Sequence, residues 1–291
     1  MQVRFDRKNH EFRPITVETG LVNEAEGSCK WTSGSAARQS KTIVLASVHG
    51  PAVPKYLRHE DFRGLSVDVE YSTGLGGGQG GGDPSAAPSS SSSEQQRAER
   101  LGEKIIKSCI LGCVDAKAFP RMLLCLRVAV IEDDGGALPC AVNACITALA
   151  SAGVPMLHMP LAVSIVNQTQ VSAGGESAMD QGSDSDSDKN NGNGKSKVIL
   201  SLLDPVREEE LESESRFLLV LRPSMRGEGG ADKEEEDMEE DEGEEGGQFR
   251  PRVLYQDCAG SFSPQQLGQA LEAGAQAVQQ LLRVVRGALA E

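Results

Sequence analysis

The stretch Glu132–Pro155 reads EDDGGALPCAVNACITALASAGVP and carries most of the information about the fold. Its acidic turn ends at Gly135-Gly136, and Pro139, which lacks a backbone N–H, suits the first turn of a helix. The small apolar residues of Cys140–Gly153 predict a buried helix that ends at the glycine. Because Met122–Ile131 is largely apolar, as a buried strand is, we expect strand, tight turn and helix to pack together.

Periodicity in the rest of the sequence predicts a single α+β domain. Leu65–Tyr71 alternates apolar and polar residues, as a strand with one buried face does. Gln96–Val114 has an apolar stripe at helical spacing instead, and Pro264–Ala290 is a second amphipathic helix that Ser263 caps. The other apolar runs are expected to be strands: Ile15–Thr19, Thr42–Val48, Leu161–Asn167, Val198–Leu203 and Phe217–Leu221. We therefore expect residues 1–291 to form one domain in which a sheet packs on helices.

Three tracts read as insertions into this domain: residues 74–94, 169–197 and 227–247. The first is rich in Gly and Ser, the second in Ser, Asp, Gly and Asn, and the third in Glu, Asp and Gly. None has enough apolar surface to offset the entropy of ordering it, so we expect disordered surface loops. No Lys-Ser/Thr follows the glycines of the first tract, which favours a flexible linker over a phosphate-binding loop.

The net charge of −14 is concentrated in one place. Twelve acidic residues and one Lys lie between Glu228 and Glu245, which leaves −3 for the rest of the chain. A strongly acidic protein would repel nucleic-acid phosphates, but here the acidity says little about the folded domain. RNA therefore stays open as a partner.

Cysteine and histidine usage argues against a disulfide framework and against a metal centre. The seven cysteines are odd in number, no CxxC pair occurs, and the four histidines are scattered. Cys109 and Cys113 lie one helical turn apart, but without a third nearby ligand they are expected to be buried core thiols. The charged N-terminus lacks a signal-like apolar stretch, and no apolar run is long enough to span a bilayer. We expect an intracellular protein that has no membrane-spanning segment and binds no metal ion or cofactor.

Several short motifs occur in an order that resembles the RNase PH family, and in particular the smaller, bacterial-RNase-PH-like ring subunits of the eukaryotic RNA exosome. The motifs are Arg13-Pro14-Ile15, a turn at Ala25-Glu26-Gly27-Ser28, Gly50-Pro51-Ala52, Asp134-Gly135-Gly136 before Asn143–Leu149, Ala152–Met156, and Asp204-Pro205 followed by Glu208-Glu209. This resemblance implies the RNase PH (ribosomal protein S5 domain 2-like) α+β fold. It also implies paralogous RNase PH-like subunits in a hexameric ring, cap subunits, a separate exonuclease and RNA as partners, in nucleus, nucleolus and cytoplasm.

The resemblance also implies where a phosphorolytic site would lie, and several of its residues are missing here. Where the family has the phosphate-binding Arg of a G-T-R-T turn, this chain has Leu138, and the following Pro139 removes a backbone donor. Lys107 stands where the family has one of an arginine pair, so the bidentate fork is lost. The family's two carboxylates, six residues apart, correspond to Glu210 and Arg216, and a cation at the second position would repel a metal ion. We expect a non-catalytic subunit with a degenerate phosphate site at Leu138 and Lys107.

One charged loop suits contact with RNA. Lys55, Arg58 and Arg63 are our candidates for phosphate contacts, with Arg38 and Lys41 nearby in sequence and Tyr56 available to stack on a base. An ordinary solvated loop, or one that approaches a neighbouring subunit, fits the same residues.

Two other functions stay open. The first is an active phosphorolytic 3′ exoribonuclease, which Leu138 disfavours. The second is a module that binds basic proteins through residues 228–245.

Asp133 and Asp134 form a candidate acid/base pair, although adjacent carboxylates before two glycines more often set turn geometry.

Overall fold

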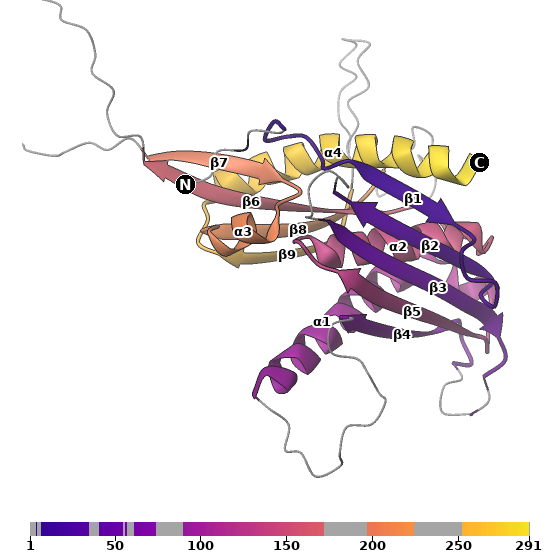
Figure 1. Cartoon of the computed structure of the whole chain (residues 1–291). Coiled ribbons are helices and arrows are strands. Elements are labelled where there is room, and N and C mark those ends of the chain that lie inside the picture. Colours follow the sequence, from indigo (N-terminus) through magenta and orange to yellow (C-terminus); the bar gives the residue numbers. More distant parts are fainter. Residues whose placement is uncertain are drawn as a thin grey trace, which may run out of the picture.

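The computed structural model describes residues 4, 7–34, 41–54, 56, 61–73, 90–171, 197–223 and 252–290. A mixed β-sheet, an antiparallel β-sheet and their covering helices form the α+β arrangement in Figure 1. Among the described residues, no helix is both long and apolar enough to cross a membrane.

The first sheet has five strands in the order β1-β2-β3-β5-β4. Its strands are β1 (Ile15–Thr19), β2 (Gly27–Ser33), β3 (Thr42–Ala52), β4 (Ser66–Thr73) and β5 (Leu123–Glu132). All neighbours are antiparallel except β4 and β5, which run parallel. A parallel pair needs a crossover connection, and α1 (Ser90–Cys113), followed by the short 3₁₀ helix η2 (Ala116–Ala118), provides it.

The second sheet has four antiparallel strands in the order β7-β6-β8-β9. These are β6 (Leu161–Val171), β7 (Lys197–Leu203), β8 (Ser215–Arg222) and β9 (Arg252–Gly260), with the five-residue helix α3 (Arg207–Leu211) between β7 and β8. The long C-terminal helix α4 (Pro264–Ala290) contacts β6 and β8 and also β1, so it lies across both sheets (Figure 1).

Helix α2 (Ala137–Ser151) lies at the centre of the fold and packs on β2, β3 and β6. Its small side chains let the strands approach closely. At Gly27 an added Cβ would lie 2.3 Å from the carbonyl oxygen of Ala148, so only glycine fits there. Asn143 joins the helix to the second sheet, because its side-chain amide donates to the Ala162 carbonyl (2.9 Å) and accepts from the Ala162 N–H (2.7 Å).

The buried core runs from the first sheet through α2 to the second sheet. Trp31 on β2, Ile146 on α2 and Phe217 on β8 are each at most 1% exposed. Burial of a large apolar side chain contributes about 1.5–3 kcal/mol, so this shared core holds the two sheets and α2 together as one unit.

The structure corrects several expected boundaries. Gly27-Ser28 begins strand β2 instead of forming a turn, because the turn lies just before it and Gly27 is needed for the contact with α2. Helix α1 begins at Ser90, so the end of the expected 74–94 insertion is helical, since serines are tolerated in a first turn. Strands β6 and β7 pair out to Val171 and Lys197, so the ladder enters the expected 169–197 insertion from both ends.

Strands β2 and β9 and helix α3 were not expected from sequence. In the sequence analysis the start of β2 was placed in a turn, β9 is a largely exposed edge strand, and α3 is short and acidic. Residues 74–89, 172–196 and 227–247 lie outside the described residues, so their predicted disorder stays a prediction.

Candidate functional site

The candidate site lies at the acidic turn of residues 133–136, which connects β5 to helix α2. Gly135 (φ +94°) and Gly136 (φ +67°) both adopt left-handed backbone conformations, which favour glycine. A Cβ at Gly135 would lie 2.6 Å from the backbone nitrogen of Arg207, which donates to the Asp134 carbonyl at 3.0 Å. Helix α3 is therefore docked directly on the turn, and its side chains are brought to the start of α2.

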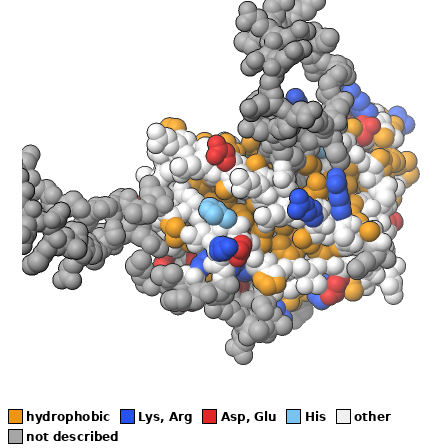
Figure 2. Space-filling view, turned by 90° about the horizontal axis from the view of Figure 1, so that it is seen from above, with side chains coloured by type: hydrophobic (Ala, Val, Ile, Leu, Met, Phe, Trp, Pro, Cys, Tyr) orange, Lys and Arg blue, Asp and Glu red, His pale blue; other side chains and the backbone are white. Residues whose placement is uncertain are grey.

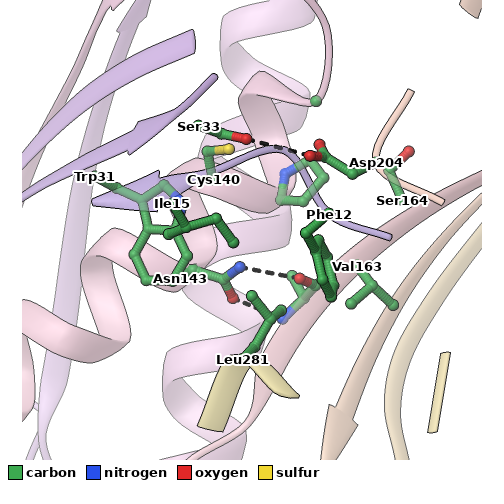
Figure 3. Close-up of a pocket in the computed structure, with 13 residues that line it drawn as sticks. Phe12, Ile15, Trp31, Ser33, Cys140, Asn143, Val163, Ser164, Asp204 and Leu281 are labelled. Atoms are coloured by element: carbon green, nitrogen blue, oxygen red, sulfur yellow. Dashed lines mark hydrogen bonds between the residues drawn. The ribbon is translucent and has the colours of Figure 1, made fainter. Parts of the chain in front are cut away.

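A buried ion pair between Arg13 and Asp204 lies beside the turn. The Arg13 guanidinium donates to both carboxylate oxygens of Asp204, at 2.7 and 3.0 Å, and the Arg13 backbone N–H donates to the same carboxylate. Ser33 adds a fourth hydrogen bond to this carboxylate (Figure 3). The Arg13 guanidinium also donates to the carbonyls of Asp134 and Gly135, so it ties the N-terminal segment, the turn and the end of β7 together.

Asp204 is ionised despite its burial. Burial by itself would raise its pKa, but the hydrogen bonds and charge of Arg13, with the charge of Arg7, hold this pKa below its usual range. Asp204 also has a left-handed backbone (φ +49°), an uncommon conformation that aspartate tolerates better than most residues. The pair is thus an internal anchor whose charges already have partners.

Two more arginines of the N-terminal segment extend this anchor to α3. Arg4 makes a bidentate pair with Glu209, with both bonds at 2.5 Å, and donates to the Leu203 carbonyl at 2.9 Å. Arg7 donates to the Asp204 carbonyl and lies 3.5 Å from its carboxylate. These contacts hold α3 in place against the second sheet.

Glu210, the next residue on α3, lies at the start of α2. Its carboxylate accepts a hydrogen bond from the Gly136 N–H at 3.0 Å, and no side chain of the N-cap residue itself satisfies the helix end. Burial raises the Glu210 pKa, as does the charge of Asp133, whereas the Gly136 N–H and the charges of Arg216 and Arg13 lower it. The two positions that correspond to the family carboxylates, Glu210 and Arg216, are thus electrostatic neighbours.

The two degenerate phosphate-site residues lie on different helices. Leu138 is in the first turn of α2, partly buried against the core, and Pro139 follows it. Lys107 is exposed on α1. In the part of the chain that the structure describes, no hydrogen bond or ion pair joins Lys107 to the turn before α2.

The hollows near the site are small or shallow. A cavity of about 20 Å³, room for about one water, lies between Trp31, Cys140, Asn143 and Asp204 (Figure 3). A more open hollow lies between the segment Glu11–Ile15 and the Gln280, Leu281 and Val284 side chains of α4. The face above α4 shows hydrophobic side chains in a band with a few basic side chains beside it (Figure 2).

Only part of the predicted basic loop can be placed. Lys55, Arg58 and Arg38 lie outside the described residues, and Arg63 is exposed. Lys41 pairs with Glu132 at 3.3 Å, so its charge is already engaged.

Phe62, in the described part of this loop, pairs with Arg121 of the segment between η2 and β5, a contact that the sequence did not reveal. Phe62 is 68% exposed, and the guanidinium of Arg121 lies 4.8 Å from its ring centroid. Arg121 has a left-handed backbone (φ +63°), and its N–H donates to the carbonyls of Asp61 and Gly64. These bonds position the cation over the ring.

The other candidates have structural roles. Burial raises the pKa of Cys109 and of Cys113 to about 12, so both thiols stay protonated. No cluster of potential metal ligands occurs among the residues placed by the structure. Asp133 accepts a hydrogen bond from the Gly135 N–H at 3.0 Å, which confirms the turn interpretation for this carboxylate.

Sequence reasoning missed the arginine anchor of Arg4, Arg7 and Arg13. Arg13 was noted only as part of a motif, and its partner Asp204 lies 191 positions away along the chain. The available signal for this pair was that one motif places Arg13 next to a proline and another places Asp204 next to a proline.

Comparison with known proteins agrees with this geometry. Residues 11–155 match the model of the RNase PH family, described as the 3′ exoribonuclease family, domain 1. The rice protein named "Exosome complex exonuclease RRP46 homolog" (Oryza sativa subsp. japonica) is 27% identical over 161 residues, which cover 55% of this chain and 58% of that protein. The chain thus spans little more than half the length of this curated relative.

Solved structures show the same fold over nearly the whole chain. The crystal structure of rice (Oryza sativa) Rrp46 superposes with a TM-score of 0.65 at 20% identity and covers 98% of this chain and 99% of that one. The Archaeoglobus fulgidus exosome, with RNA bound to the active site, superposes with a TM-score of 0.58 at 15% identity and covers 95% and 90%. The expected α+β fold is confirmed, and residues 11–155 of the chain are an RNase PH family domain.

Proposed function

We propose that this protein is a non-catalytic RNase PH-type subunit of an exosome core ring and supports 3′-to-5′ RNA processing and decay. The observation that carries the proposal is the start of α2. Binding of inorganic phosphate there needs charged donors, but the first turn presents the aliphatic Leu138 and then Pro139, which has no N–H. Nothing in this turn neutralises a phosphate ion.

A ring role is supported by the names of the relatives, which are exosome proteins. Paralogous RNase PH-like subunits would form a hexamer with this chain, cap subunits would cover one face, and a separate exonuclease would cleave the RNA. We propose the nucleus, nucleolus and cytoplasm as its location, because the RNA substrates of such a complex occur there.

RNA contact would be made by the loop between β3 and β4. The exposed Arg63 and Phe62, with Arg121 beside the ring, offer a cation and an aromatic face, which single-stranded RNA binds through phosphate and base stacking. Lys55 and Arg58, which shortly precede Phe62 and Arg63 in the sequence, stay candidates for phosphate contact. Because these groups offer no patterned readout of base edges, binding would not depend on sequence.

Affinity purification of the tagged endogenous protein with mass spectrometry tests the ring assignment. We expect RNase PH-like paralogues in amounts equal to the tagged chain. Recovery of the chain alone, or with basic proteins that are lost when residues 228–245 are deleted, would support the acidic-module alternative instead.

Complementation tests the non-catalytic assignment in the same cells. Replacement of the wild-type gene by a Leu138→Glu variant should leave rRNA processing intact provided that the variant folds and the ring assembles, because a chain that does not bind phosphate has no phosphate contact to lose in this turn. Accumulation of unprocessed rRNA, with the ring still assembled, would favour the active phosphorolytic exoribonuclease.

A further inference from the structure

The outer face of helix α1 carries a row of cations that the fold does not use. The four residues are all exposed and follow one another at intervals of three or four positions: Arg97, Arg100, Lys104 and Lys107. At 3.6 residues per turn they lie within a sector of about 80° and extend over about 15 Å of the helix. We call this row the α1 stripe.

The opposite face of α1 packs on the rest of the domain. Gly102 lies against the ring of Tyr71 on β4, and Ile106 and Cys109 are each at most 1% exposed. This inner face contacts β4, α2 and β9, and Figure 1 shows the start of α1 projecting beyond the sheets. The α1 stripe therefore faces away from the core and is accessible to another molecule.

No internal partner neutralises the α1 stripe. In the part of the chain that the structure describes, none of its four cations makes an ion pair or a side-chain hydrogen bond. The acidic residues of the helix lie outside the sector of the stripe: Glu94, Glu99 and Glu103. By contrast, three arginines of the N-terminal segment each have a carboxylate partner: Arg4, Arg7 and Arg13. The charges of the stripe are thus left for a partner outside the fold.

The form of the stripe favours a linear polyanion over a protein surface. Phosphates recur at regular intervals along an RNA strand, so a straight row of cations can neutralise several of them together. Binding sites for proteins depend instead on aromatic anchors, and leucine is uncommon among them. Helix α1 has no aromatic residue, and its exposed large apolar side chains are Leu101 and Leu111.

The C-terminal end of α1 lies next to the loop to which we assign RNA contact. Helix η2 follows α1, and its Ala116 carbonyl accepts a hydrogen bond at 2.9 Å from the N–H of Leu65, at the end of that loop. Arg121, shortly after η2, holds the ring of Phe62 in the same loop. RNA bound at the loop therefore lies at one end of α1.

We propose that the α1 stripe is a second RNA-binding surface, which holds the sugar–phosphate backbone of a single strand. This inference rests on the proposed role in RNA processing and adds a binding surface to it. Lys107 also belongs to the degenerate phosphate site, so the proposal is carried by Arg97, Arg100 and Lys104. Because these cations form no patterned readout of base edges, binding does not depend on RNA sequence.

RNA binding by the purified full chain tests this inference. Arg100→Gln with Lys104→Gln removes two charges from the stripe and keeps residues of similar helix propensity. At about 0.1 M salt this variant should bind oligo(U) and oligo(A) of about 20 nucleotides at least about tenfold more weakly than the wild type, with equal losses for both. The slope of the logarithm of the binding constant against the logarithm of salt concentration should become shallower by about 1.4 units. Adding Arg97→Gln should weaken binding further.

A matched control removes two exposed cations from another helix. Arg283→Gln with Arg286→Gln on α4 should weaken binding by less than about twofold, because salt screens charges more than about 10 Å from the RNA. Thermal melting checks that both variants are folded. Equal losses in the two variants would show a general effect of charge and would overturn the inference.

Three other results would also overturn it. These are unchanged RNA affinity in the stripe variant, no measurable RNA binding by the folded wild-type chain, and weakened ring assembly with unchanged RNA affinity, which would assign the α1 stripe to a protein partner. Failure of the proposed function would appear elsewhere, as a purification without RNase PH-like paralogues. RNA binding by the isolated chain does not mimic that result.

Discussion

The turn before α2 and the loop between β3 and β4 both carry clusters of charge, but they differ in where their partners lie. Arg13 and Asp204, which pack against the turn, are at most 8% exposed and hydrogen-bonded to each other. In the loop, Arg63 and the ring of Phe62 face solvent. Charges with buried internal partners stabilise the fold, whereas an exposed cation such as Arg63 can contact another molecule. The buried pair therefore serves the fold, and the exposed loop is the surface to which the proposed function assigns RNA contact.

The largest expected effect comes from breaking the anchor of the turn. Asp204→Asn should lower the free energy of unfolding by about 3–5 kcal/mol, because it removes the closest counter-charge of the buried Arg13 guanidinium and leaves only Asp134, at 3.7 Å. Urea denaturation measures this. The matched control is Asp257→Asn on the exposed edge strand β9, which should cost less than about 0.5 kcal/mol. Similar losses in the two variants would mean that the anchor does not stabilise the fold.

The Arg13–Asp204 pair also predicts how the stability of the protein depends on pH in acid. Because the folded-state pKa of Asp204 is lowered, its stabilisation is present above the unfolded pKa of about 3.9 and is lost as the pH falls through the folded pKa. The stability difference between wild type and Asp204→Asn should therefore be constant from pH 7 to about pH 5 and shrink below about pH 4. Chemical denaturation across this range checks it, and a difference that grows in acid would contradict the assigned pKa direction.

The exposed loop is tested by RNA binding to the assembled ring. Changing Lys55, Arg58 and Arg63 together to Ala should weaken binding equally for all RNA sequences. The slope of the logarithm of the RNA-binding constant against the logarithm of salt concentration should become shallower by roughly one unit for each phosphate that the altered loop no longer binds. Filter binding at several salt concentrations measures both. Lys117→Ala, an exposed cation on η2, is a control for general loss of charge.

Two contrary results are informative for this loop. Loss of ring assembly with unchanged RNA affinity would assign the loop to a subunit interface. Unchanged assembly and unchanged RNA binding would show that the loop is an ordinary solvated surface.

The smallest expected effect concerns Glu210. Because burial raises its folded-state pKa, the ionised carboxylate costs stability as the pH rises above the unfolded pKa of about 4.3. Glu210→Gln keeps an acceptor for the Gly136 N–H and should stabilise the protein at pH 7 by less than about 1 kcal/mol. The gain should vanish near pH 4, whereas the exposed Glu208→Gln should change little at either pH. Destabilisation by Glu210→Gln at pH 7 would mean that the charge itself holds the helix start.

The fold could be predicted where local pattern and packing agree. The Gly-Gly turn and small-residue helix at residues 135–151 were expected because glycine conformation and helix propensity act within a few residues. Strand β2 was missed altogether, and its Gly27 was placed in a turn, because the reason for this glycine is the approach of α2, whose contacting Ala148 lies far along the chain. The exposed β9 carries no alternation, since an edge strand contributes little to the core.

The residues of the site could be predicted from the sequence, but the contacts that they make could not. Leu138 and Glu210 were singled out from motif positions, but nothing local shows that Glu210 reaches the Gly136 N–H, 74 positions away. The Phe62–Arg121 pair likewise depends on a left-handed backbone at a non-glycine residue, which propensity does not indicate.

The central claim is that the start of α2 no longer supports phosphorolysis, and one assay tests it most directly. The purified chain is incubated with oligo(A) and inorganic phosphate, and the release of nucleoside diphosphate is followed. We expect no release, and none from Leu138→Arg either, because Arg216 still occupies the position of a family carboxylate. Release by the wild-type chain that Leu138→Glu abolishes would contradict the account and identify the protein as an active phosphorolytic exoribonuclease.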